Sequence, residues 1–99
     1  NWYTVGTDSN GVTWSIDNDS VKKDDKKAVM DIKAMDYEGY HYIVTEEFNH
    51  KKREVKDLKV TLYNPQGYVV KEEQVNKNSR KVEPGTPAYA VFQLIWGGK

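Results

Sequence analysis

The chain has 99 residues, a formal net charge of zero from 15 basic and 15 acidic side chains, and no cysteine. A chain of this length can bury a core without covalent staples, so we expect a single domain over residues 1–99. The absence of cysteine excludes disulfides, thiolate metal sites and thiol catalysis. A nucleic-acid partner is not expected, because nucleic-acid binders normally carry a basic excess. No stretch approaches the roughly 18 apolar residues of a transmembrane helix.

The N-terminal segment predicts a β-hairpin. Residues 2–7 and 12–17 alternate apolar and small or polar side chains on either side of Asn10-Gly11, a strong hairpin signal because both residues tolerate positive φ. A loop of two residues and a loop of four residues both remain open. In either case four apolar side chains share a face: Tyr3, Val5, Trp14 and Ile16.

Two longer strands are predicted next, over residues 28–37 and 40–50, joined at Glu38-Gly39. Residues 17–21 before them read as a polar turn or a single helical turn, and residues 22–27 (KKDDKK) as a solvated turn. The first of these strands places four side chains on one face: Ala28, Met30, Ile32 and Ala34. The second places five on one face: Tyr40, Tyr42, Val44, Phe48 and His50.

Residues 53–63 and 68–75 complete a set of six strands. The turn at 64–67 (NPQG) separates these two; its proline fixes φ at the second position, and its glycine is conformationally free at the fourth. Strict alternation along 53–63 places four side chains on one side: Lys56, Leu58, Val60 and Leu62. A polar loop is predicted over residues 76–83. Because consecutive strands are joined by tight turns, the sheet is expected to be an antiparallel meander.

One helix is predicted, over residues 88–96, with Thr86 as its N-cap, Pro87 at its start and Gly97-Gly98 at its end. Its residues are apolar almost all round, so the helix must be buried. A helix this short is marginal by itself, and a sheet face must therefore receive it. The architecture expected is α+β.

The aromatic stripe of Tyr40, Tyr42 and Phe48 allows two interpretations. Sheet aromatics stack on bases or sugars in some RNA-binding folds. The face that receives the helix, however, needs apolar cover, and we expect the stripe to belong to the core.

Side chains that carry chemistry are scattered. His41 and His50 lie nine residues apart on one predicted strand, so they point to opposite faces and cannot share a metal ion within that strand. Paired carboxylates such as Glu46-Glu47 are adjacent and also point to opposite faces, which argues against two-carboxylate catalysis. No nucleophile motif or phosphate-binding glycine loop is present. We expect no enzymatic activity, no metal and no cofactor.

A compact basic cluster, His50-Lys51-Lys52-Arg53, lies at a predicted hairpin tip. Lys51, Lys52 and Arg53 are candidate contacts for an acidic protein surface, a sulfated glycosaminoglycan or an anionic lipid. The alternative, which we favour at this point, is a solvated turn that protects a sheet edge from aggregation.

Residues 2–21 and residues 82–96, at the two ends of the chain, resemble the two ends of the surface-adhesin protein E family. Residues 2–21 (WYTVGTDSNGVTWSIDNDSV) show its opening pattern of tryptophan, V-G step, acidic turn ending in glycine, aromatic strand and D-x-x-S-V corner. Residues 82–96 (VEPGTPAYAVFQLIW) show its closing P-G-T and short apolar helix. Residues 48–56 and 62–70 occupy the places of its central strands. The resemblance implies a curved antiparallel six-stranded sheet with the C-terminal helix on the concave face.

Many family members tether this helix to the sheet by a disulfide, whose cysteines would map to about His50 and Trp96. The sequence departs from the family pattern at both positions. We expect the two rings to pack together in place of the bridge.

The resemblance also implies an exported bacterial protein, periplasmic or at the cell surface and often lipid-anchored, with a protein partner; some relatives bind host matrix and plasma proteins. We therefore expect a non-enzymatic envelope or surface interaction module. Two alternatives stay open: an accessory structural domain of a larger exported protein, and an enzyme or small-ligand carrier that uses a cleft between sheet and helix. A deep apolar cavity with converging polar groups would favour the carrier.

Overall fold

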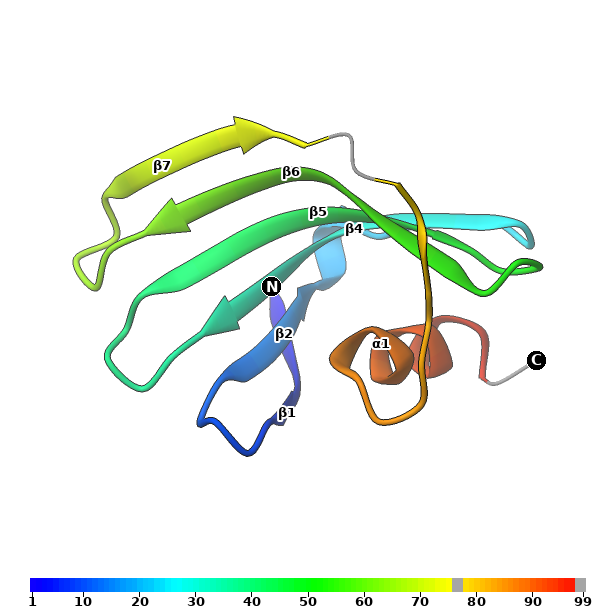
Figure 1. Cartoon of the computed structure of the whole chain (residues 1–99), viewed down its shortest axis with the longest axis horizontal. Helices are drawn as coiled ribbons and strands as arrows, with labels where there is room; N and C mark the ends of the chain where they lie inside the picture. The colour runs from blue at the N-terminus through cyan, green and yellow to red at the C-terminus, as the bar shows by residue number, and fades with distance from the viewer. Residues whose placement is uncertain (76–77, 98–99) are drawn as a thin grey trace.

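The computed structural model describes residues 1–75 and 78–97. These form, in order, β1 (Trp2–Thr7), β2 (Thr13–Asp17), the 3-10 turn η1 (Asn18–Ser20), β3 (Lys22–Lys23), β4 (Lys27–Met35), β5 (His41–Asn49), β6 (Glu54–Tyr63), β7 (Val69–Gln74), β8 (Arg80–Lys81) and α1 (Pro87–Trp96). Six strands pair antiparallel in the order β1-β2-β4-β5-β6-β7. The strands curve, and α1 lies on their concave side (Figure 1). The predicted α+β fold, an antiparallel meander with one C-terminal helix on the concave face, is confirmed.

Three hairpin turns share the pattern Asp/Asn-x-x-Gly, at residues 8–11, 36–39 and 64–67. In each, the first side chain accepts hydrogen bonds from the backbone N–H groups two and four residues later. The glycine in fourth position has positive φ, between 81° and 95°. Asn10 does not have positive φ, and Thr7 pairs with Thr13, so five residues separate the strands of the first hairpin and the expected loop of two or four residues was wrong. Side-chain capping and a left-handed glycine together set the register of these hairpins.

Two short strands were not expected. The prediction of a turn over residues 22–27 was wrong at both ends, because β3 pairs with β4 and Lys27 already belongs to β4. β2 and β3 lie along the same side of β4, and η1 interrupts them. There the Ser20 hydroxyl takes over as acceptor for the Asp31 N–H, at 2.9 Å. β8, predicted as loop, likewise follows β7 along β6, where it pairs with Glu54 and Val55; Asn76 and Lys77 of that loop lie outside the described residues.

A β-bulge in β6 reverses part of the predicted alternation. Val60 pairs with Val44 and Asp57 with Glu46, so Leu58 is the extra residue. The expectation that Lys56, Leu58, Val60 and Leu62 share one side was therefore wrong. Beyond the bulge it is Val55 and Asp57, not Lys56, that face the helix side, and Val55 is buried.

The core lies between α1 and one end of the sheet. Its fully or nearly buried apolar members are Ile16, Ala28, Met30, Ile32, Phe48, Val55, Val91, Phe92 and Ile95. The Thr86 hydroxyl accepts the Tyr89 N–H at 3.2 Å, as an N-cap should. Gly97 closes the helix in the left-handed conformation, with its N–H donating to the Gln93 carbonyl. Gly98, the second expected stop residue, lies outside the described residues.

The helix is not buried all round, and the aromatic stripe is not all core. Leu94 is 51% exposed, Tyr40 45% and Tyr42 47%, whereas Phe48 is fully buried. A ten-residue helix covers about 15 Å, whereas the nine residues of β5 extend about 30 Å. The helix therefore covers only the half of the concave face that contains Phe48.

Candidate functional site

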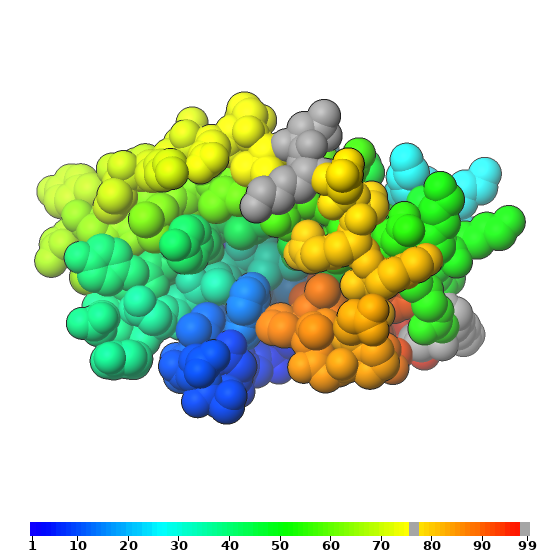
Figure 2. All heavy atoms as spheres, viewed as in Figure 1, coloured from blue at the N-terminus to red at the C-terminus, as the bar shows by residue number. Residues whose placement is uncertain are grey.

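Two basic turns meet at one end of the molecule. The turn between β5 and β6 carries Lys51, Lys52 and Arg53, and residues 22–27 lie beside it. The His50 N–H donates to the Lys26 carbonyl at 2.9 Å, which fixes the two turns together. Figures 1 and 2 show both turns projecting from the same end of the sheet. We call this surface, residues 22–27 and 51–53, the basic end.

The basic end carries seven cationic side chains and two carboxylates. The carboxylate of Asp24 accepts the backbone N–H groups of Lys27 and Lys26, and these bonds lower the pKa of Asp24. The Asn49 side chain accepts the Lys52 N–H at 3.0 Å and orders the second turn. Lys51 and Lys52 make no ion pair within residues 1–75 and 78–97. Both turns are thus fixed by backbone contacts, while cationic side chains stay available.

The C-terminal end of α1 packs against the basic end. His50 stacks on Trp96 with ring centroids 4.4 Å apart and an interplanar angle of 2°. Phe92 meets Trp96 edge-on at 5.0 Å, and the indole N–H of Trp96 donates to the Asp24 carbonyl. Lys23 donates to the Ile95 carbonyl at 2.8 Å, a favourable place for a cation at a helix C-terminus. The expected packing of His50 against Trp96 is confirmed.

The other histidine lies apart. His41 stacks on Tyr63 at 4.9 Å, at the opposite end of β5 from His50. The prediction that the two histidines do not converge is confirmed. Within residues 1–75 and 78–97, no group of three or more His, Asp or Glu side chains is placed to hold a metal ion.

A cleft of about 540 Å³ separates the helix start from the sheet. Its walls are mostly apolar, and charged side chains enter it from β5, β6 and β8: Glu46, Asp57 and Arg80. Glu46 is only 7% exposed, and its carboxylate accepts Arg80 Nη2 at 2.9 Å. Arg80 Nη1 donates to Asp57 at 3.2 Å. Burial, and then hydrogen bonding to and repulsion by Asp57, raise the pKa of Glu46 to about 8.

The pairing of Glu46 with Asp57 is a feature that reasoning from adjacent carboxylates missed. The two residues are cross-strand partners, and Asp57 reaches this face only because of the bulge at Leu58. A sequence signal existed in the polar position of Glu46 between Val44 and Phe48 on an otherwise apolar face. The arrangement holds a proton in a partly apolar site close to neutral pH.

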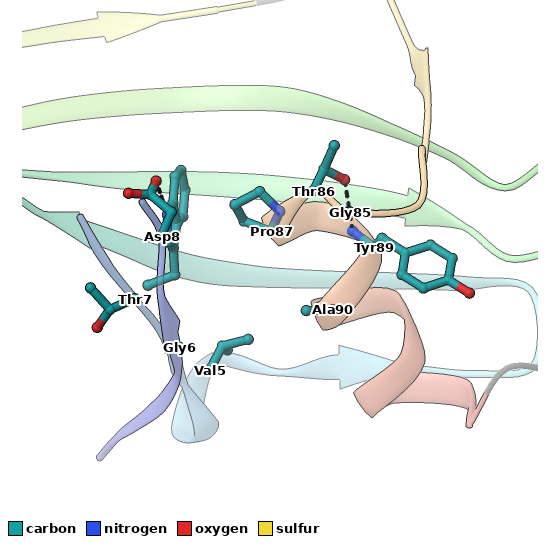
Figure 3. Close-up of a pocket in the computed structure, with 10 residues that line it drawn as sticks. Val5, Gly6, Thr7, Asp8, Gly85, Thr86, Pro87, Tyr89 and Ala90 are labelled. Carbon is teal, nitrogen blue, oxygen red and sulfur yellow. Dashed lines mark hydrogen bonds between the residues drawn. The ribbon is translucent and has the colours of Figure 1, made fainter. Parts of the chain in front are cut away.

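A second pocket, of about 340 Å³, lies between β1 and the helix start. Figure 3 shows the β1 residues on one side of it and Thr86, Pro87 and Ala90 on the other. Its one carboxylate, Asp8, already accepts the Asn10 and Val12 N–H groups and the Trp14 indole N–H. The bond from Val12 makes the largest contribution to lowering the pKa of Asp8. Asp8 thus serves the β1–β2 turn, and the pocket offers little further polar chemistry.

Comparison with known families matches residues 2–95 to the surface-adhesin protein E family. The chain belongs to this family. No curated protein and no solved structure matches the chain.

Membership in the surface-adhesin protein E family suggests a surface adhesin-type role, a non-enzymatic protein and an exported or cell-surface location. No helix in the described residues is long and apolar enough to cross a membrane. Among these features, the basic end combines positive charge, order and exposure.

Proposed function

We propose that this surface-adhesin protein E domain is a non-enzymatic interaction module, acting in the periplasm or at the cell surface, that binds an acidic surface of a partner protein through the basic end. The observation that carries the proposal is the meeting of residues 22–27 with Lys51, Lys52 and Arg53 on one ordered platform. The family supports adhesin-type binding, and the charge supports an acidic partner.

The order of the basic end matters for its affinity for a partner. Flexible loops lose conformational entropy when they bind, whereas preorganised ones lose less. Here the Asp24 and Asn49 side chains fix both turns, and the Trp96 indole anchors the Asp24 carbonyl. Arg53, in the left-handed region at φ 52°, is held over the Phe92 ring at 5.5 Å. These contacts place the cations before a partner arrives.

The test is charge reversal at the tip. Surface plasmon resonance would measure binding of wild type and of the double variant Lys51→Glu/Lys52→Glu to immobilised matrix and plasma proteins. A control variant, Lys59→Glu/Lys71→Glu, changes the net charge equally but on β6 and β7. Arg53 is left in place because it packs on Phe92.

We expect the tip variant to weaken binding by about tenfold or more, with a slower association rate, and we expect added salt to weaken wild-type binding strongly. The control variant should retain wild-type affinity within about twofold, because charges distant from an interface are screened. Equal binding by wild type and tip variant would refute the basic end as the contact surface. No binding by the wild type would favour the alternative of a structural accessory domain.

A further inference from the structure

The cleft between α1 and the sheet is built like a small-molecule site. Its volume, about 540 Å³, falls within the range of about 300–1,000 Å³ of ligand pockets. Apolar walls come from β2, β4, β5 and α1: Trp14, Ile32, Val44, Pro87 and Ala88. None of these side chains can hydrogen-bond to a polar ligand atom except Trp14, whose indole N–H is directed to Asp8. Polar recognition is thus concentrated on the side where Glu46 lies.

That side carries more negative than positive charge. Arg80 contacts both Glu46 and Asp57, so one guanidinium faces two carboxyl groups. Two ionised carboxylates in a partly apolar site repel each other, and a proton retained by Glu46 relieves the repulsion. A positive group placed beside the two carboxylates would serve the same purpose as this proton.

The remaining charges around the cleft do not supply that positive group. Lys81 of β8 is directed away, to Glu54 at 3.5 Å and to the Lys52 carbonyl at 3.0 Å. Glu83, in the segment before α1, adds a further negative charge to the lining. The lining residues from β2, β4 and α1 bear no charge. The charge balance of the cleft therefore favours a cation.

We propose that this cleft binds a small organic amine, with its ammonium group at Glu46 and Asp57 and its apolar body against Trp14, Ile32 and Pro87. The apolar walls favour such a ligand over a hydrated inorganic cation, since burial of its hydrocarbon body away from water is favourable. Binding exchanges one ion for another: the ammonium enters, and the proton of Glu46 leaves to solvent.

Phenethylamine is a suitable probe, with 2-phenylethanol and 3-phenylpropionate as neutral and anionic controls of similar shape. The chain has three tryptophans, so an amide–indole NMR spectrum contains three indole N–H signals. Trp14 lines the cleft, whereas Trp96 stacks on His50 and Trp2 lies beneath Lys33. We expect phenethylamine to shift the Trp14 signal saturably and to leave the other two in place. The alcohol and the carboxylate should shift none of them.

Glu46→Gln keeps the side-chain shape and removes the charge. It should weaken phenethylamine binding by about tenfold or more, the usual effect of losing a charged hydrogen-bond partner. The matched control is Glu47→Gln, one residue away on the opposite face, where Glu47 pairs with Lys56; it should bind as wild type does. Calorimetry at pH 7 in two buffers should show nearly one proton released per amine bound by wild type, and none by Glu46→Gln.

Three outcomes would overturn the proposal. The first is that the Trp14 signal shows no saturable shift up to about 10 mM amine, a concentration well above the dissociation constant of an ordinary weak complex. The second is equal binding of the alcohol or the carboxylate. The third is unchanged affinity in Glu46→Gln, which would place the amine elsewhere. None of them bears on the basic end, which is tested separately.

Discussion

Replacing Glu46 with Gln should change how the stability of the domain depends on pH. Glu46 is buried, and its folded-state pKa is raised from 4.5 to about 8. Between these two values the folded chain keeps a proton that the unfolded chain has lost. The free energy of unfolding of the wild type therefore falls as pH rises from about 5 to 8, at no more than about 1.4 kcal/mol per pH unit from this group.

The magnitude follows from the size of the shift. Integrated from pH 5 to pH 8, a single carboxyl with these two pKa values lowers the free energy of unfolding by roughly 3 kcal/mol. Gln mimics the protonated carboxyl, because its amide can donate to Asp57 while its oxygen accepts from Arg80. The variant should match wild type within about 1 kcal/mol at pH 5, the usual range for a near-isosteric change. At pH 8 it should be more stable than wild type.

Urea unfolding followed by tryptophan fluorescence, repeated at each pH unit from 5 to 8, measures this difference directly. Glu47→Gln is the control, since Glu47 lies on the opposite face and pairs with Lys56 at 3.8 Å. That variant should keep the wild-type slope. If Glu46→Gln also kept the wild-type slope, Glu46 would not hold a proton in the folded state, and the reasoning about the cleft would be wrong.

Three further predictions concern stability and are read by urea unfolding at pH 7. Trp96→Ala should lower the free energy of unfolding by about 2–3 kcal/mol through lost stacking and burial; an unchanged value would mean that the ring stack does not hold α1. Gly39→Ala should lower the free energy of unfolding more than Gly67→Ala does. Both glycines have positive φ, but of the two only Gly39 would bring a Cβ to 3.2 Å from Pro65. Equal losses of stability would contradict this contact. Thr86→Ala should lower the free energy of unfolding by about 1 kcal/mol, because it removes the N-cap hydroxyl. Thr86→Ser should lower it much less, because serine keeps a hydroxyl.

Local signals were enough to predict much of this fold. The turn residues Glu38-Gly39 and 64–67 and the Thr86-Pro87 helix start act over a few residues, and the strands and the helix that they bound were confirmed. β8 gave no such signal, because its two residues become a strand only by pairing with β6. The exposure of Tyr40 and Tyr42 could have been predicted from the lengths of α1 and β5, since the short helix cannot cover the whole of the longer strand.

The candidate sites show the same division. Lys51, Lys52 and Arg53 were found as a run of charge, and residues 22–27 could have been joined to them, because alternate turns of a meander lie at the same end of the sheet. The partnership of Glu46 with Asp57 could not, because it depends on one extra residue, Leu58, whose position is set by pairing across β5 and β6. The sequence of β6 shows a change of phase between Val55 and Val60 but does not show which residue between them is the extra one.

The stack of His50 on Trp96 has a practical consequence for experiments on this domain. Aromatic rings pack at the place where the family resemblance implies a disulfide, and the chain contains no cysteine. A single cysteine introduced at Lys51 would be the one thiol in residues 1–99. A spin label or fluorophore attached there would report on the basic end without mispaired disulfides. The variant could also be treated with reductant before labelling, because there is no native disulfide to break.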